Sequence, residues 1–244
     1  MMRHLQCHAV RGALLAAGLV ASLAALAPSA MADDSGPQNT VFVGLAYLQN
    51  HSKSANLSGY NTPPNLNLDV GNASTLGLVY VRNLPGPFSF ELVLGYPPRV
   101  RTDAAGPGWG ALRGAGVTDV DVYSPTAFIN YHFFGDYAKW DPFVGLGINY
   151  TKFTNTKALP PLTGAQGPTQ INLSDSWGAA AHVGLIYRFN PKWSVVGTVA
   201  IADVQSDLTS TSFSPVNPSI ITSQAKTHIN FHPIVYTLAV GYSF

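Results

Sequence analysis

Large apolar residues occur at every second position in several segments of the chain. Between Phe88 and Tyr96, for example, they alternate with residues such as Ser89 and Glu91. Because successive side chains of a β-strand point to opposite faces, such a segment has one bulky apolar face and one face of small or polar residues. The same alternation is found in these segments: 76–80, 129–133, 144–150, 183–189 and 234–244.

The pattern predicts eight strands separated by connections of two kinds. Three connections are short, and the other four are about twenty residues long and rich in Pro, Gly, Asn, Ser and Thr. The predicted strands are 39–49, 73–83, 87–98, 120–133, 140–153, 174–190, 193–204 and 227–244. The long connections are 50–72, 99–119, 154–173 and 205–226.

The second face of these strands distinguishes a membrane barrel from a soluble sandwich. A soluble sandwich would turn its bulky face inward and expose charged side chains, but here the other face is mostly Gly, Ala, Ser and Thr. Bulky residues facing lipid and small or polar residues facing a lumen are typical of a transmembrane β-barrel. We therefore predict an all-β, eight-stranded antiparallel barrel with short periplasmic turns and long extracellular loops.

Composition supports this class and excludes others. Only 10% of the 244 residues are charged and Glu91 is the one Glu, which argues against disorder and against long solvated helices. The net charge of +1 argues against nucleic acid as a partner. A single Cys excludes a disulfide framework.

The first 32 residues have the organisation of a secretory signal. Arg3 and Arg11 form a basic region, 12–27 is free of charge, and Ala30 and Ala32 supply the small residues of a cleavage site. Cleavage after Ala32 would remove Cys7 and leave 33–244 as one barrel domain with 11 Lys and Arg against 12 Asp and Glu. No later segment has 18 uninterrupted apolar residues, so the sequence predicts export without a membrane-spanning helix.

Three stretches resemble the outer-membrane protein W (OmpW) family: 134–151, 173–180, and the C-terminal part from Asn230 to Phe244. The resemblance extends over most of the mature chain and is weakest in the first two long loops. It implies a barrel in the outer membrane of a Gram-negative bacterium, with a hydrophobic lumen and passage of small hydrophobic compounds that leave sideways into the membrane. Independently, eight strands leave only a narrow interior, which argues against a general porin.

The resemblance also suggests a hydrophobic gate. Trp177 lies in the family's D-S-W-G motif, which implies a lumen-lining role, whereas its alternation with Val183 places it in an aromatic girdle facing lipid; a β-bulge would reverse that facing. Leu76 and Leu78 are candidates for the other half of a constriction, although lipid contact is the simpler interpretation of both.

Three charged residues are expected to close the lumen on the periplasmic side. Glu91, Asp141 and Arg188 all lie close to short turns, and their alternation places them on the lumen face. Opposite charges in a narrow lumen should pair, so we predict a polar floor. The simpler alternative is that each charge is solvated at the rim.

Other chemistry is weakly represented. His132 and His182 lack further candidate ligands, and His228 and His232 lack a third partner, so we predict no metal site and no cofactor. Ser176 and His182 are about 20 Å apart along one strand and no G-x-S-x-G elbow occurs, so we predict no enzymatic activity.

The C-terminal strand is expected to be an assembly signal for the outer-membrane insertion machinery. Its alternation runs unbroken to a terminal aromatic residue through Tyr236, Leu238, Val240, Tyr242 and Phe244. The sequence thus predicts a narrow conduit for small hydrophobic substrates, embedded in outer-membrane lipid. The alternative is a surface receptor or structural barrel whose loops bind a partner without transport.

Overall fold

The computed structural model describes residues 37–134 and 138–244. The predicted signal, 1–32, lies outside the described residues, as does part of the turn that precedes Lys139. No helix within the described ranges is long and apolar enough to span a membrane.

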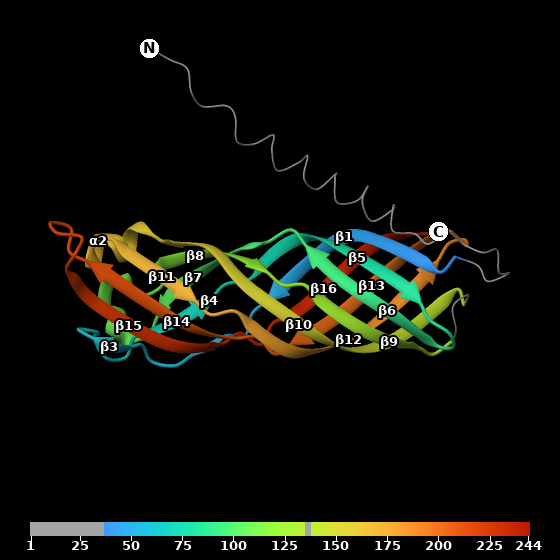
Figure 1. Cartoon of the computed structure of the whole chain (residues 1–244), viewed down its shortest axis with the longest axis horizontal. Coiled ribbons are helices and arrows are strands. Elements are labelled where there is room, and N and C mark those ends of the chain that lie inside the picture. Colours follow the sequence, from blue (N-terminus) through green and yellow to red (C-terminus); the bar gives the residue numbers. More distant parts are fainter. Residues whose placement is uncertain (1–36, 135–137) are drawn as a thin grey trace, which may run out of the picture. The chain divides into compact units, whose positions relative to one another are not determined.

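Eight antiparallel strands close into a barrel (Figure 1). Each strand pairs with its neighbour along the chain, and the last strand pairs with the first from Thr40 opposite Ser243 to Gln49 opposite Ile234. The barrel strands are β1 (Asn39–Gln49), β5 (Ala73–Asn83), β6 (Phe88–Gly95), β9 (Thr126–His132), β10 (Trp140–Ala158), β12 (Ser176–Arg188), β13 (Trp193–Ala202) and β16 (Ile234–Ser243). The prediction of an eight-stranded antiparallel barrel is confirmed.

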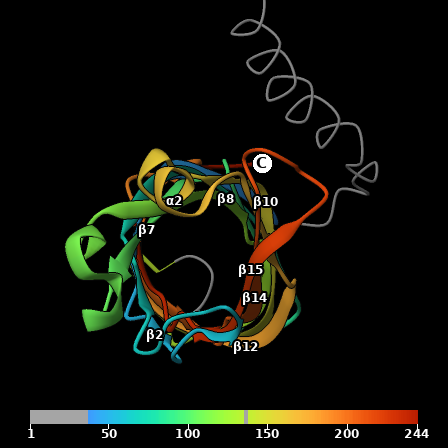
Figure 2. The ribbon, with the colours of Figure 1, turned by 90° about the vertical axis from the view of Figure 1, so that its left-hand side faces the viewer.

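The four long connections contain more regular structure than the sequence pattern predicts. They fold into two further groups of strands that continue the barrel wall beyond the membrane and form a ring when viewed from that end (Figure 2). One group consists of β4 (Asn67–Val70), β7 (Arg99–Ala105) and β8 (Gly116–Tyr123), and its strand β8 pairs with the barrel strand β10. The other holds β2 (Lys53–Ser54), β3 (Ser58–Tyr60), β11 (Thr169–Leu173), β14 (Gln205–Phe213) and β15 (Ile221–Asn230). Two short helices, η1 (Pro107–Leu112) and α2 (Pro160–Gln166), complete the connections.

Prolines divide the wall into a barrel and this extension. A proline has no N–H for a strand ladder, and Pro97, Pro98, Pro125 and Pro233 lie where β6, β8 and β15 end or their successors begin. The predicted strands 120–133 and 227–244 are therefore each divided in two at a proline, and the predicted strand 87–98 ends earlier than expected, at Gly95.

Aromatic side chains mark the two edges of the lipid-facing band. At the turn end, Trp140 packs on Tyr187 with ring centroids 4.5 Å apart; at the other, Tyr150 packs on Trp177 at 4.7 Å. Between Trp140 and Tyr150 on β10, outward residues such as Leu146 are exposed. Ten residues of a tilted strand span about 25 Å, the height of the apolar band of outer-membrane barrels.

The core is divided in the same way. Inside the barrel, a cluster around Phe42, Phe143 and Val196 fills part of the lumen. Inside the extension, a larger apolar cluster includes Leu68, Trp109 and Ile229.

Candidate functional site

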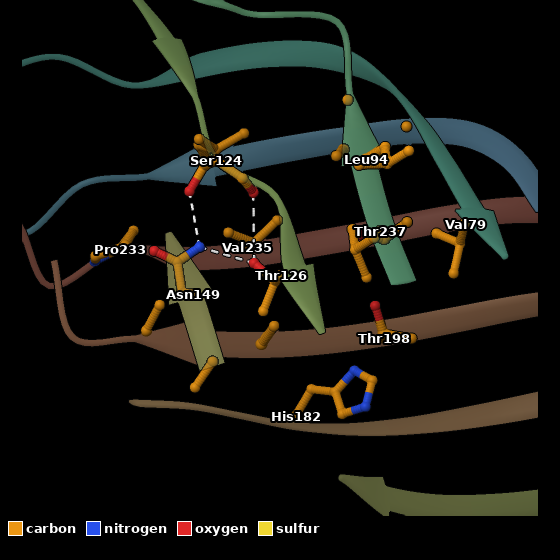
Figure 3. A pocket seen from close by; sticks show the side chains of 18 of the residues that line it. Val79, Leu94, Ser124, Thr126, Asn149, His182, Thr198, Pro233, Val235 and Thr237 are labelled. Atoms are coloured by element: carbon orange, nitrogen blue, oxygen red, sulfur yellow. Dashed lines mark hydrogen bonds between the residues drawn. The ribbon is translucent and has the colours of Figure 1, made fainter. Parts of the chain in front are cut away.

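The barrel holds an elongated, largely apolar cavity that is partly open to solvent. Inward residues from every barrel strand line it, among them Val79, Thr198, Val235 and Thr237 (Figure 3). Where the barrel meets the extension, Val100, Val122 and Phe231 continue the apolar lining. The cavity therefore offers a mainly apolar environment along most of the lumen.

Glycines on the lumen face make room for large side chains from other strands. A Cβ atom at Gly145 would lie 2.2 Å from Asn130 Oδ1 and 2.3 Å from His182 Nε2. A Cβ at Gly184 would lie 2.3 Å from the ring of Phe143. The small residues that the alternation revealed thus face a lumen filled by a few bulky or polar groups.

A buried polar cluster lies in the part of this cavity that is nearer the short turns. Asn130 Nδ2 donates to Glu91 Oε2 at 2.7 Å, and Asn130 Oδ1 lies 2.7 Å from His182 Nε2. The His182 ring stacks on Phe128 with centroids 3.9 Å apart. Since Glu91 is 5% exposed and Asn130 1%, this cluster belongs to the interior of the barrel.

A second polar chain lies nearer the turns. His132 bridges Ser89 Oγ and Asp141 Oδ2, each at 2.8 Å, and Arg188 Nη2 donates to the same Asp141 oxygen at 2.9 Å. The Ser-His-Asp connectivity resembles that of a hydrolase triad. However, Ser89 and Asp141 are fully buried, and neither lines the cavity, so Ser89 is not placed to attack a bound solute.

The three residues of the predicted polar floor all lie at the turn end, on the inner face of the wall. Arg188 is ion-paired with Asp141 as expected for opposite charges, but Glu91 is hydrogen-bonded to Asn130 rather than paired with Arg188. Sequence reasoning missed Asn130 and treated His132 and His182 only as weak metal candidates. The alternation along each strand places Asn130, His132 and His182 on the lumen face, as it does Glu91 and Asp141. This common facing could have indicated that they form polar clusters.

The gate candidates face away from the lumen, which corrects the predicted gate. Trp177 is 73% exposed and Leu76 60%, and neither they nor Leu78 line the cavity. The pairing of β10 with β12 runs without a bulge from Thr151 opposite Ser176 to Trp140 opposite Tyr187, so the facing of Trp177 is not reversed. Trp177 instead belongs to the outer aromatic girdle.

The barrel wall is interrupted between β6 and β9. Their ladder ends where Val93 faces Thr126, and pairing resumes beyond the prolines, where the Val122 N–H donates to the Pro98 carbonyl at 3.0 Å. In the described residues between these points, 94–97 form no ladder pairs with 123–125. Leu94, Tyr96 and Ser124 line the cavity, while Tyr96 is 75% exposed, so the cavity borders the outer surface here.

Both edges of this interruption are held in place. On one side, the Tyr96 N–H donates to the Leu76 carbonyl at 3.0 Å and the Thr75 hydroxyl donates to the Tyr96 carbonyl. On the other, Asn149 Nδ2 donates to Ser124 Oγ at 2.8 Å and to Thr126 Oγ1 at 2.7 Å (Figure 3). The first edge is therefore bound to β5 and the second to β10.

An ion pair lies just beyond the interruption, outside the membrane-spanning strands. Arg99 Nε donates to Asp121 Oδ1 at 2.9 Å across β7 and β8. This hydrogen bond lowers the pKa of the Asp121 carboxyl below its ordinary value and raises the pKa of Arg99. The pair joins β7 and β8 immediately beyond the interruption.

Within the described ranges, no group of three or more His, Cys, Asp and Glu residues is arranged to hold a metal ion. Glu91 is instead hydrogen-bonded to Asn130, and His132 and Arg188 both contact Asp141.

Known proteins with solved structures share this fold. OprG of Pseudomonas aeruginosa superposes with a TM-score of 0.74 at 23% identity, covering 86% of this chain and 96% of that one. The structure of AlkL in lipid bilayers superposes with a TM-score of 0.56 at 19% identity, covering 89% of this chain and 94% of that one.

Sequence comparison identifies the family. Outer membrane protein W of Vibrio cholerae is 29% identical over 70% of this chain and 71% of its own length, and that of Escherichia coli is 28% identical over 72% and 75%. Such proteins are outer-membrane barrels of Gram-negative bacteria and not enzymes. The OmpW family model matches residues 38–244, and the chain therefore belongs to the OmpW family of outer-membrane proteins.

Proposed function

We propose that this protein is a narrow conduit that takes small hydrophobic molecules from outside the cell and releases them sideways into the outer membrane. The observation that carries the proposal is the apolar lumen cavity, which borders the outer surface at the interruption between β6 and β9. An apolar solute gains about 25 cal/mol for each Å² of its surface that leaves water, so such a lumen favours its entry.

The polar clusters at the turn end of the lumen favour sideways release over passage straight through the barrel. A solute moving toward the periplasm would have to displace the Glu91, Asn130 and His182 cluster and then the Arg188–Asp141 pair. Separating buried polar or charged groups from their partners costs several kcal/mol by order of magnitude. Moving through the wall beside Leu94 requires no such separation. In this proposal the two clusters are the polar floor.

The opening also lies at a suitable depth. It is bordered by Tyr96 and Tyr123, which are both exposed on the outer surface, and tyrosines of barrels gather at the membrane–water interface. A released solute would therefore enter the outer edge of the bilayer rather than its centre.

A second candidate function is a surface receptor. The observation that favours it is the length of the extension: β10 continues for eight residues beyond Tyr150, to Ala158, and two groups of strands rise with it. Such a surface can bind a partner without any transport through the lumen.

Uptake of a hydrophobic dye by cells with and without the protein tests the conduit. The decisive variant is Thr198→Trp, which fills the lumen at a side chain that points into it (Figure 3) and leaves the extension unchanged. A conduit predicts that uptake falls to the level of cells without the protein. The matched control is Val199→Trp, whose side chain faces outward and should leave uptake unchanged. Equal uptake by cells with the parent protein and cells without it would favour the receptor.

A further inference from the structure

A second, separate chamber lies above the lumen cavity, inside the extension. Its lining is mainly apolar. Leu57, Leu68, Trp109, Leu162 and Leu208 contribute the large side chains. We refer to it as the outer chamber.

The strands of the extension place the two spaces one above the other. Residues two apart on a strand point to the same face. On β7, Val100 lines the lumen cavity and Thr102 the outer chamber; on β8, Val120 and Thr118 do the same. On β15, Ile229 lies between Ala225 of the outer chamber and the lumen cavity, and it is 1% exposed. The outer chamber therefore lies on the extracellular side of the lumen cavity, and Ile229 lies between the two.

One polar group in the outer chamber has no partner. Thr118 is 4% exposed, and its Oγ1 atom makes no hydrogen bond to any of the described residues. By contrast, the Ser223 hydroxyl, also in the lining, reaches the carbonyls of Tyr60 and Asn61 at 3.4 and 3.2 Å. A buried hydroxyl left unpaired costs about 1–3 kcal/mol, so Thr118 offers a hydrogen bond to a molecule that enters the chamber.

We propose that the outer chamber is a capture site for a small apolar molecule that carries one hydrogen-bonding group, of the class of short-chain alcohols and ketones. The apolar walls bind the hydrocarbon part, and the Thr118 hydroxyl donates to the carbonyl or hydroxyl oxygen of the ligand. Binding itself is independent of transport. Only the role of the chamber as the first station of the conduit rests on the function proposed above.

Trp109 is a built-in reporter of the outer chamber. It is one of four tryptophans in the chain, and its side chain, 8% exposed, lines the chamber with its indole N–H donated to the Asn67 carbonyl at 2.8 Å. Replacing Trp140, Trp177 and Trp193 with Phe leaves it as the sole tryptophan. Bromine quenches indole fluorescence on contact, so 4-bromobutan-1-ol and 1-bromobutane are suitable probes, the second lacking the hydroxyl.

Two substitutions at Thr118 distinguish the contribution of its hydroxyl to binding from the contribution of its side-chain shape. In the single-tryptophan protein, Thr118→Val removes the hydroxyl at nearly constant shape, and Thr118→Ser keeps it. We expect bromobutanol to quench Trp109 saturably, with an affinity that falls about three- to tenfold in Thr118→Val, the worth of one hydrogen bond, and is retained in Thr118→Ser. The affinity for bromobutane should not fall in either variant. Heat-modifiable gel mobility shows that each variant is folded.

Two results would overturn the capture site: no saturable quenching of Trp109, or equal bromobutanol affinities in the Val and Ser variants. Dye uptake, measured on the same proteins, reports on the lumen separately. Loss of the Thr118 effect with normal uptake would refute the capture site alone, whereas saturable, Thr118-dependent binding without uptake would refute the conduit alone.

Discussion

Single residues decide how the lumen is filled, and Gly145 does so most directly. The Asn130 and His182 side chains occupy the space that a Cβ at this position would need. We expect Gly145→Ala to lower the free energy of unfolding by about 1–3 kcal/mol, the usual cost of overpacking a filled interior. Urea unfolding in lipid, followed by the gel mobility of the folded barrel, measures this change.

Gly77 supplies the matched control. It also lines the lumen cavity, but a Cβ there would meet nothing within 4 Å. Gly77→Ala should leave the stability unchanged or slightly raised. Equal losses in the two variants would show that the Asn130–His182 contact does not explain the requirement for glycine at position 145.

His228, in the extension, is expected to titrate above its ordinary range. A hydrogen bond from its Nδ1 to Asp207 Oδ1 at 2.7 Å raises the pKa of the imidazole above 6.5. Because the folded pKa is the higher one, the stabilisation is fully present below about pH 6.5 and is lost as the pH rises through the folded value. The pair is largely exposed, so its effect on stability should be small.

An NMR titration of the imidazole measures this pKa directly. Asp207→Asn should return it toward 6.5, while Asp203→Asn, at a carboxylate that accepts hydrogen bonds from Gln205 Nε2, should not. A His228 pKa at or below 6.5 in the parent protein would contradict the pairing.

At the scale of elements, the sequence predicted the membrane strands better than the extension. The predicted bounds of β5, 73–83, agree with the structure because two-residue periodicity is strong where one face meets lipid. Those of β1, 39–49, also agree, although the alternation in that segment is ambiguous. The extension has water outside and an apolar core inside, and its short strands are interrupted by Pro and Gly, so the same residues resembled loops.

The lumen side chains were only partly predictable. Parity placed Glu91, Asp141 and Arg188 on the inner face, but the partner of Glu91 depends on the register of β6 against β9, where Ser89 faces Asn130. For Trp177, the sequence left two facings open, and the unbroken pairing of β12 with β10 decided between them. Pairing register is a property of the closed sheet and is weakly encoded in any one strand.

The last strand, β16, is the element in which we expect the assembly signal to lie. Its outward residues Tyr236, Leu238, Val240 and Tyr242 are 39–65% exposed, and Phe244 follows at 49%. Deleting Phe244 should lower the amount of heat-modifiable, folded barrel recovered from outer membranes, because the insertion machinery would lose the terminal aromatic residue. Deleting the exposed residue Val216 from the turn between β14 and β15 serves as control. Normal recovery without Phe244 would remove this residue from the signal.

At the scale of the whole molecule, the polar floor is expected to seal the barrel against ions. Combining Glu91→Ala with Arg188→Ala removes one charge from each of the two polar clusters and leaves Asp141 without its cation. Ion conductance in planar bilayers should rise well above that of the parent protein, because water can then hydrate the vacated lumen. Unchanged conductance in a folded double variant would exclude the floor as the seal.

Sideways release through the wall is the central claim, and closing the interruption between β6 and β9 tests it most directly. Leu94→Cys and Ser124→Cys place thiols on its two edges, both in the lining of the cavity, and a short reversible cross-linker can join them. The matched control joins Val43→Cys to Leu78→Cys, which face each other across the intact ladder of β1 and β5.

The measurement is the rate at which a hydrophobic dye enters membranes that contain each purified barrel. We expect the cross-link between Leu94→Cys and Ser124→Cys to lower this rate to that of protein-free membranes. Cleaving the linker should restore the rate, and the control cross-link should have no effect. A rate that is unchanged while the opening is cross-linked would contradict sideways release.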